Sequence, residues 1–163
     1  MADNGRLDDR YKIAYDSSAS LIAGQRSIVD NLRQRATVLV TAVTISVSLS
    51  VSVGLLGTGA KPLPGWALAF LLALVVLVGG CSFYILLPRA WIFGHSGSAI
   101  IQEHIEGDDP SSINDMYRDM TIYLDRYFDD NERQLGRLFK AFQVGVLGLA
   151  AEVVVLIVGF STR

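Results

Sequence analysis

A stretch of twenty almost uninterrupted apolar residues near the carboxyl end places the strongest constraint on the fold of this chain. Residues 141–160 read AFQVGVLGLAAEVVVLIVGF and contain one ionisable side chain, Glu152. A helix needs roughly 20 such residues to cross a hydrocarbon core about 30 Å thick. We therefore expect residues 141–160 to form a transmembrane helix.

Small residues and Glu152 share one face of this predicted helix. They recur at alternating intervals of four and three residues, which keeps side chains on one side of an α-helix. The face comprises Ala141, Gly145, Gly148, Glu152, Val155 and Gly159. Small residues let helices approach closely, and a carboxylate facing lipid costs at least about 2.5 kcal/mol. We expect this face to contact other helices or water.

Two earlier segments are also long and apolar. The first is residues 36–57, in which Thr44 to Val53 alternate polar and apolar side chains as a β-strand does, but a membrane barrel needs many such strands and the chain has one. A helix is therefore favoured for residues 36–57, as it is for residues 66–87, which end before Pro88. The sequence GTGAKPLPG between them predicts a hairpin turn. The composition, 51% hydrophobic and 18% charged, agrees with a membrane protein.

Hydroxyl side chains form a row along the first of these predicted spans. The row comprises Thr37, Thr41, Thr44, Ser48 and Ser52. These side chains could line a polar pathway, but in membrane helices such residues more often bond to their own backbone or across a tight interface. We favour packing. Gly79 and Gly80 in the second span mark another point where helices could pack closely.

The polar segments, residues 1–35 and 88–140, each contain an amphipathic helix. The apolar stripe of the first is Leu7, Tyr11, Ala14, Ser18, Leu21, Gln25, Ile28 and Leu32, flanked by Tyr15, Ile22 and Val29. In the second, residues 96–105 can form a short helix. Ser112 with Asp115 resembles a capping box, which starts a helix with no breaker before residue 160. We expect the two long helices to pair, because each alone would expose an apolar stripe.

These features predict an all-α integral membrane protein with three transmembrane helices and a cytoplasmic helical stalk. The expected regions are a cytoplasmic amphipathic helix (residues 1–35), transmembrane helices at residues 36–57, 66–87 and 141–160, and a cytoplasmic helical region (residues 88–140) that completes the stalk. All Lys and Arg residues except Lys61 and Arg163 lie in the two polar segments. By the positive-inside rule, the amino terminus and residues 88–140 are cytoplasmic and the carboxyl terminus lies outside.

The sequence offers little for catalysis or metal binding. His95 and His104 lack a third ligand at zinc-site spacing, and Cys81 lies within an apolar span. The acidic runs at residues 108–109 and 129–132 could hold a divalent ion, but such runs on loops and helix faces are usually only solvated. The sequence has no phosphate-binding glycine loop and no Ser-His-Asp arrangement. From these missing motifs we expect no enzymatic activity, metal or cofactor. The net charge of −2 indicates no nucleic-acid partner.

Several short motifs support a family resemblance that covers about residues 25–163. They are Asn31-Leu32-Arg33-Gln34-Arg35 before the first span, Leu86-Leu87-Pro88-Arg89 after the second, Asn131, Leu135, Leu138, Phe139 and Phe142 before the third, and Ala151-Glu152-Val153 within it. This layout resembles the small transmembrane effectors of Pycsar, the bacterial pyrimidine-cyclase antiphage systems. The resemblance implies a multi-pass protein of the bacterial inner membrane. On infection, a partner cyclase would make cyclic CMP or cyclic UMP, the cytoplasmic region would sense it, and loss of membrane integrity would cause abortive infection.

Candidate functional residues follow from the needs of such a ligand. A phosphate requires cations and a base requires aromatic faces, which Arg118, Arg126, Arg133, Tyr123 and Tyr127 could supply. The alternative is that the tyrosines form the stalk core, that the arginines are solvated, and that the chain is a non-enzymatic scaffold whose stalk binds protein partners. We also expect a homo-oligomer in the lipid bilayer, since three helices cannot enclose an aqueous path.

Glu152 is the intramembrane functional candidate, because ionisable residues inside membrane spans are rare and are often functional. It could line a path that favours cations. It could instead be structural, protonated or hydrogen-bonded to hydroxyls such as those of Thr44 or Ser48, which lie at a comparable depth in the first span. The structural role is favoured for the resting state.

Overall fold

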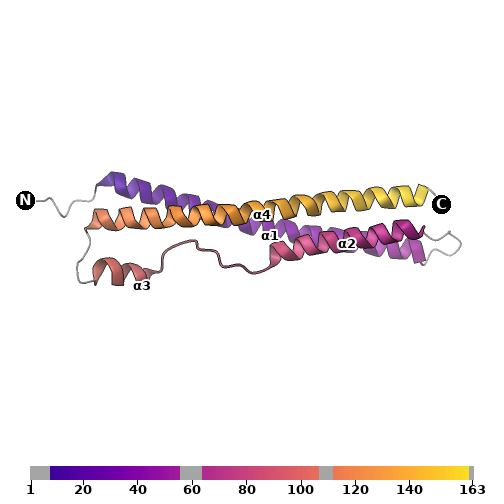
Figure 1. The fold of residues 1–163 in the computed structure, drawn as a ribbon, viewed down its shortest axis with the longest axis horizontal. Helices are drawn as coiled ribbons and strands as arrows, with labels where there is room; N and C mark the ends of the chain where they lie inside the picture. The colour runs from indigo at the N-terminus through magenta and orange to yellow at the C-terminus, as the bar shows by residue number, and fades with distance from the viewer. Residues whose placement is uncertain (1–7, 56–63, 107–111, 162–163) are drawn as a thin grey trace, which may run out of the picture. The chain divides into compact units, whose positions relative to one another are not determined.

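The computed structural model describes residues 8–55, 64–106 and 112–161, and every regular element in these ranges is helical (Figure 1). The elements are α1 (Asp9–Leu55), α2 (Gly65–Leu86), α3 (Gly97–Ile100), the π-helical turn η1 (Ile101–Ile105) and α4 (Ile113–Ser161). Most of the predicted hairpin and the acidic pair Asp108 and Asp109 lie outside the described residues. The all-α prediction is thus confirmed for the described part of the chain.

The chain divides into two compact units, to which α1 and α4 both contribute. The first unit comprises Met1–Val29 and Arg89–Leu135, and the second comprises Asp30–Pro88 and Gly136–Arg163. Each helix is continuous, as the absence of a breaker between residues 112 and 160 indicated for α4.

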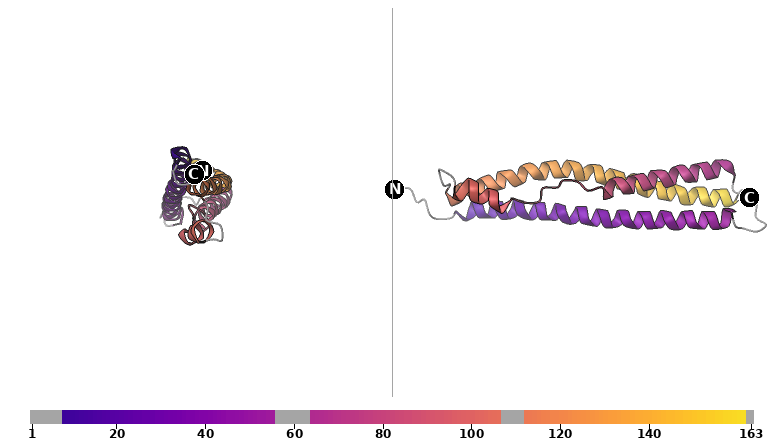
Figure 2. Two further views of the ribbon diagram at one scale, coloured as in Figure 1. Left: turned by 90° about the vertical axis from the view of Figure 1, so that its left-hand side faces the viewer. Right: turned by 90° about the horizontal axis from the view of Figure 1, so that it is seen from below.

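In the first unit, the start of α1 lies beside the start of α4 and runs in the same direction (Figures 1 and 2). Ser18 Oγ donates to Asp125 Oδ1 at 2.8 Å, and Gln25 Nε2 donates to the Phe128 carbonyl at 3.1 Å. The ring of Tyr15 meets that of Tyr117 edge-on. The residues joined by the two hydrogen bonds are more than a hundred positions apart in the sequence.

The buried side of α1 differs slightly from the predicted stripe. Leu21 and Ile28, which were placed in the stripe, are 54% and 42% exposed, whereas Ile22 and Val29 beside them are each 1% exposed. The pattern alone could not distinguish these neighbours, because both sets recur at the same interval. The position of the partner helix α4 decides which set is buried.

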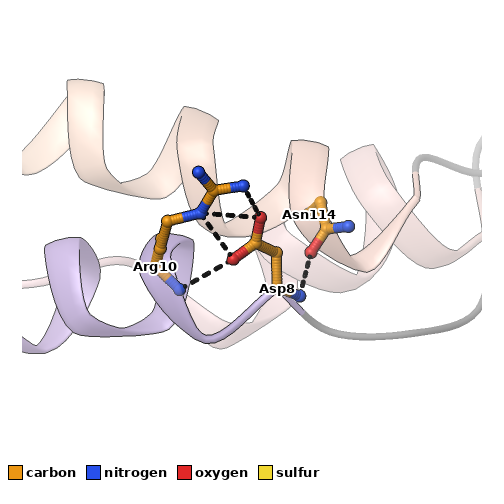
Figure 3. A network of polar contacts seen from close by, with 3 residues as sticks. All are labelled: Asp8, Arg10 and Asn114. Carbon is orange, nitrogen blue, oxygen red and sulfur yellow. Dashed lines mark hydrogen bonds and ion pairs between the residues drawn. The ribbon is translucent and has the colours of Figure 1, made fainter.

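Asp8 caps the first turn of α1 (Figure 3). Its Oδ1 accepts from the backbone N–H of Arg10 at 3.0 Å, which satisfies one of the otherwise unpaired amides of a helix start. The Arg10 guanidinium also bonds both carboxylate oxygens, the shortest contact being 2.6 Å. The backbone N–H of Asp8 donates to Asn114 Oδ1 at 2.9 Å, which ties this cap to α4.

The cap predicts a measurable titration. The hydrogen bond with the Arg10 side chain lowers the pKa of Asp8 from 3.8 to about 2. Because this pKa is depressed, the capping contribution is complete above pH 3.8 and is lost as the pH falls through about 2. In an NMR titration, we expect Arg10→Ala to return the pKa of Asp8 towards 3.8, while Lys12→Ala, which removes a neighbouring exposed cation, leaves it near 2. Equal effects of the two substitutions would contradict this account of the cap.

The start of α4 follows the predicted capping box. The N–H of Asp115 donates to Ser112 Oγ at 3.2 Å, and that hydroxyl donates to Asp115 Oδ2 at 2.6 Å. From Leu124 onward, every seventh residue of α4 is buried: Leu124, Asn131, Leu138, Gly145, Glu152 and Gly159. A strict seven-residue repeat is typical of helices that pack along one continuous seam.

In the second unit, α2 packs antiparallel to the end of α4. A Cβ atom built at Gly145 would lie 3.6 Å from Cys81 Cβ, and one at Gly148 would lie 2.8 Å from Val78 Cγ2. The numbering rises along α4 as it falls along α2, which gives the direction. By contrast, Gly79 and Gly80 have open space around them and are exposed, so they make no close contact with the described helices of this chain.

Hydroxyls on the second-unit part of α1 bond to the helix itself. Thr37, Thr41, Thr44 and Ser48 each donate to the carbonyl oxygen four residues earlier, at 2.8 to 3.1 Å. All four residues are exposed. The interpretation that these hydroxyls satisfy their own backbone is therefore confirmed, and they do not form a closely packed face with α2 or α4.

Two of the described helices are long and apolar enough to cross a membrane, α2 (Gly65–Leu86) and the stretch Ile113–Gly159 of α4. Only 22% of the most apolar stretch of α2 and 17% of that of α4 are buried. Large apolar side chains such as Leu72 and Val76 of α2 and Leu147 of α4 are two-thirds exposed. A soluble core helix would bury such residues, so these helices could span a membrane. The predicted span at residues 36–57 runs beyond the described residues and stays a prediction.

Candidate functional sites

The first candidate site lies in the first unit, where the segment containing α3 and η1 meets α4. His95 connects the two: its Nε2 lies 3.1 Å from the Met120 carbonyl, and its ring centre lies 4.1 Å from that of Tyr123. A carbonyl oxygen only accepts, so the imidazole nitrogen donates this hydrogen bond. Asn131 provides a second link, since its Nδ2 donates to the Ile92 carbonyl at 2.9 Å. The non-helical segment after α2 is thus held against α4.

A cavity of about 150 Å³ opens beside His95, and we call it the His95 cavity. Among the described residues, its polar lining consists of His95, Ser96, Glu103, His104 and Asp119. Its apolar lining consists of Ile100, Met120 and Tyr123. η1 contributes Glu103 and His104, and in this turn the Glu106 N–H donates to the Ile101 carbonyl five residues earlier, at 2.8 Å. π-Helical turns are rare and occur frequently at functional sites.

The two candidate tyrosines belong to this cluster. Tyr123 lies between His95 and Tyr127, with a distance of 4.5 Å between the two tyrosine ring centres. A hydrogen bond with the side chain of Tyr127 raises the pKa of Tyr123. The rings therefore pack within the first unit, as the stalk-core alternative expected, although Tyr123 keeps 38% of its surface exposed.

The three candidate arginines do not converge. Arg118, Arg126 and Arg133 are all exposed and are not among the described residues that line the His95 cavity. Arg126 follows Tyr123 by three positions on α4, and Arg133 follows Arg126 by seven, so these side chains share one side of the helix. Arg118 lies five residues before Tyr123, which at about 100° per residue places it well round the helix from that ring. Arg133 approaches Asp130 at 4.0 Å, a contact between two exposed side chains.

Metal binding gains no support from the structure. Within the described residues, no group of three or more His, Cys, Asp or Glu side chains is arranged to hold a metal ion. His95 and His104 do line one cavity, although the sequence spacing alone gave no reason to connect them. The missing information was tertiary, because the short segment of α3 and η1 had to fold back onto α4 before these side chains could face one space.

The second candidate site is the face of α4 that carries Glu152, in the second unit. Glu152 is 1% exposed, and Gly145, Gly148 and Gly159 on the same face are buried. Its Oε2 atom is buried without a hydrogen-bond partner in the described structure. The suggested pairing with Thr44 or Ser48 is not observed, because these hydroxyls donate to Val40 and Thr44 carbonyls instead. Glu152 thus faces inward without the predicted bond.

Comparisons with protein-family models, with curated proteins and with solved structures find no match to this chain. The two candidate sites therefore stand on their geometry and chemistry.

Proposed function

We propose that this protein is a non-enzymatic membrane effector, in which the first unit receives a cytoplasmic signal and the second unit alters the permeability of the bilayer. The observation that carries the proposal is the combination found on α4. This one helix places Tyr123 near exposed arginines in the first unit and, in the apolar second unit, buries Glu152, whose Oε2 has no hydrogen-bond partner among the described residues. A packed scaffold does not need a buried carboxyl oxygen without a hydrogen-bond partner.

The proposed topology has three spans in the bacterial inner membrane, with the amino terminus in the cytoplasm and the carboxyl terminus outside. The length and exposed apolar surfaces of α2 and α4 support two of these spans. The helical stretch of α1 from Ala36 to Leu55 would be the third. Three helices cannot surround a water-filled path, so the active form is proposed to be a homo-oligomer.

The proposed signal is cyclic CMP or cyclic UMP from a partner pyrimidine cyclase, as the resemblance to Pycsar effectors implies. Contact with the nucleotide is assigned to the side of α4 that carries Tyr123, Arg126 and Arg133. An exposed guanidinium one turn from an exposed aromatic ring can bind a phosphate while the ring meets the base. The His95 cavity fits this ligand poorly, because its charged lining is acidic and it is smaller than the 300–1,000 Å³ typical of sites for larger ligands.

Calorimetry on the purified chain in detergent tests the signal. We expect one of the two cyclic nucleotides to bind, and Arg126→Ala to weaken binding about ten-fold, the size of one charge-assisted hydrogen bond. Arg118→Ala is the matched control, since it removes an exposed arginine of the same helix that lies five residues before Tyr123 and points away from that ring. If neither nucleotide binds, or if Arg126→Ala and Arg118→Ala weaken binding equally, the nucleotide assignment is rejected.

Dye release from liposomes tests the effector role separately. The nucleotide that binds should trigger release from vesicles containing the protein and none from empty vesicles. The competing function is a membrane scaffold whose first unit binds protein partners. The exposed Leu21 and Ile28 of α1 favour that alternative, since they leave apolar surface outside the helix pair. A scaffold would bind no cyclic nucleotide and would leave the vesicles sealed.

A further inference from the structure

The His95 cavity has a chemistry of its own that the proposed function does not use. Two carboxylates, Glu103 and Asp119, line it, whereas no Lys or Arg is found among its described lining residues. They come from different elements, η1 and α4, so the acidic character arises from folding and is not a run of acidic sequence. Such a lining attracts positive charge and repels phosphate or carboxylate ligands.

The size of the cavity narrows the ligand further. A cavity of about 150 Å³ accommodates a molecule of about the size of benzene. The apolar part of the lining, from Ile100, Met120 and Tyr123, suits a short hydrocarbon body. The described residues also lack a metal-binding group of three His, Cys, Asp or Glu side chains, which argues against a bare divalent ion.

The walls of the cavity are fixed by specific contacts. His95 is held by the Met120 carbonyl at 3.1 Å and packs on Tyr123, while Ser96 Oγ lies 2.7 Å from Ser98 Oγ. Glu103 lies on the π-helical turn η1, whereas Asp119 lies on α4. The hydrogen bond from the Glu106 N–H to the Ile101 carbonyl closes this turn. His95 is thus fixed before a ligand binds and loses little conformational entropy, while Glu103 and Asp119 at the mouth of the cavity are exposed and accessible to a ligand.

We propose that the His95 cavity is a binding site for a small organic cation, a short aliphatic amine whose ammonium group is held by Glu103 and Asp119. The amine donates charge-assisted hydrogen bonds to the carboxylates, and its methylene groups lie against Ile100, Met120 and Tyr123. The site binds such a ligand whether or not the chain acts as a membrane effector, because all of its residues belong to the first unit.

Calorimetry on the full-length chain in detergent tests this site with three probes of similar length and different charge. Putrescine is the cation, butanediol is the neutral analogue and succinate is the anion, with magnesium chloride as a fourth ligand. We expect putrescine to bind and the other three to show no heat of binding. Binding of succinate or magnesium in preference to putrescine would overturn the proposal, as would the absence of binding by all four.

Substitutions then locate the binding. Glu103→Gln and Asp119→Asn keep the shape of the side chain and remove its charge, so each is expected to weaken putrescine binding about ten-fold. Asp129→Asn is the matched control, because Asp129 is an exposed carboxylate on the same helix outside the lining. Ser96→Phe fills the cavity and should abolish binding. If putrescine binds all of these variants as it binds the original chain, the ligand sits elsewhere and the assignment is wrong.

Discussion

Gly148→Ala is expected to destabilise the second unit, while the same substitution three residues earlier is tolerated. A Cβ at position 148 would lie 2.8 Å from Val78 Cγ2, closer than real Cβ atoms approach their neighbours. Val78 is fully buried and branched at Cβ, so its methyl group cannot swing away. Overpacking of this kind costs about 1–3 kcal/mol, more than the gain of about 1 kcal/mol in helix propensity.

Gly145→Ala is the matched control. Its Cβ would lie 3.5 Å from Leu39 Cδ1 and 3.6 Å from Cys81 Cβ, which are ordinary van der Waals contacts. Only the gain in helix propensity should remain in this variant. In detergent, its unfolding temperature should therefore equal or exceed that of the original chain, whereas that of Gly148→Ala should be lower. Gly79→Ala, where the space is open, should behave like Gly145→Ala.

Removal of the obstructing methyl provides a second check. Val78→Ala in the Gly148→Ala background deletes Cγ2, so part of the lost stability should return, with a favourable coupling of about 0.5–3 kcal/mol in a double-mutant cycle. If Gly148→Ala unfolds at the same temperature as Gly145→Ala, the close approach of α2 and α4 does not exist in the protein.

The sequence predicted the faces of α4 better than those of α1. In α4, the small residues and Glu152 differ strongly from the bulky residues around them, so one face stood out and it is the face that is buried. In α1, Leu21 and Ile22 are equally apolar, and Ile28 and Val29 are too. Only the position of the partner helix decides which member of each pair is buried.

The His95 cavity shows a second limit of sequence reasoning. Helices α1 and α4 are fixed by local periodicity and capping, which are visible in the sequence, as with Ser112 and Asp115. The segment with α3 and η1 is too short to show a clear apolar period. Its position depends on long-range bonds such as that from Asn131 to the Ile92 carbonyl, and no spacing rule predicts these.

The buried polar residues of α4 form a contrasting pair. Asn131 is 3% exposed and donates to the Ile92 carbonyl, whereas Glu152 is 1% exposed and its Oε2 has no partner in the described structure. They occupy the same line of α4, three heptads apart. A buried polar atom without a partner costs about 1–3 kcal/mol. Destabilising features such as a buried polar atom without a hydrogen-bond partner are expected mainly at functional sites.

Glu152→Leu is therefore expected to raise stability and to abolish function. Leucine fills a similar volume without a polar atom, so the free energy of unfolding should rise by about 1–3 kcal/mol. Asn131→Leu is the matched control: it removes an existing hydrogen bond and should lower the free energy of unfolding. Nucleotide-triggered dye release should fall at least ten-fold in Glu152→Leu, because a carboxylate that is unpaired at rest is proposed to act when the path opens.

Glu152→Gln separates charge from hydrogen bonding. Glutamine keeps the shape and the capacity to bond but cannot ionise, so it should lose dye release as leucine does if the open path needs a negative charge. The ions that pass the original chain should then be mainly cations, measured as a reversal potential across planar bilayers. If Glu152→Leu lowers stability, Glu152 is a structural residue with a partner after all. Should dye release survive both substitutions with normal expression and assembly, Glu152 has no part in permeation.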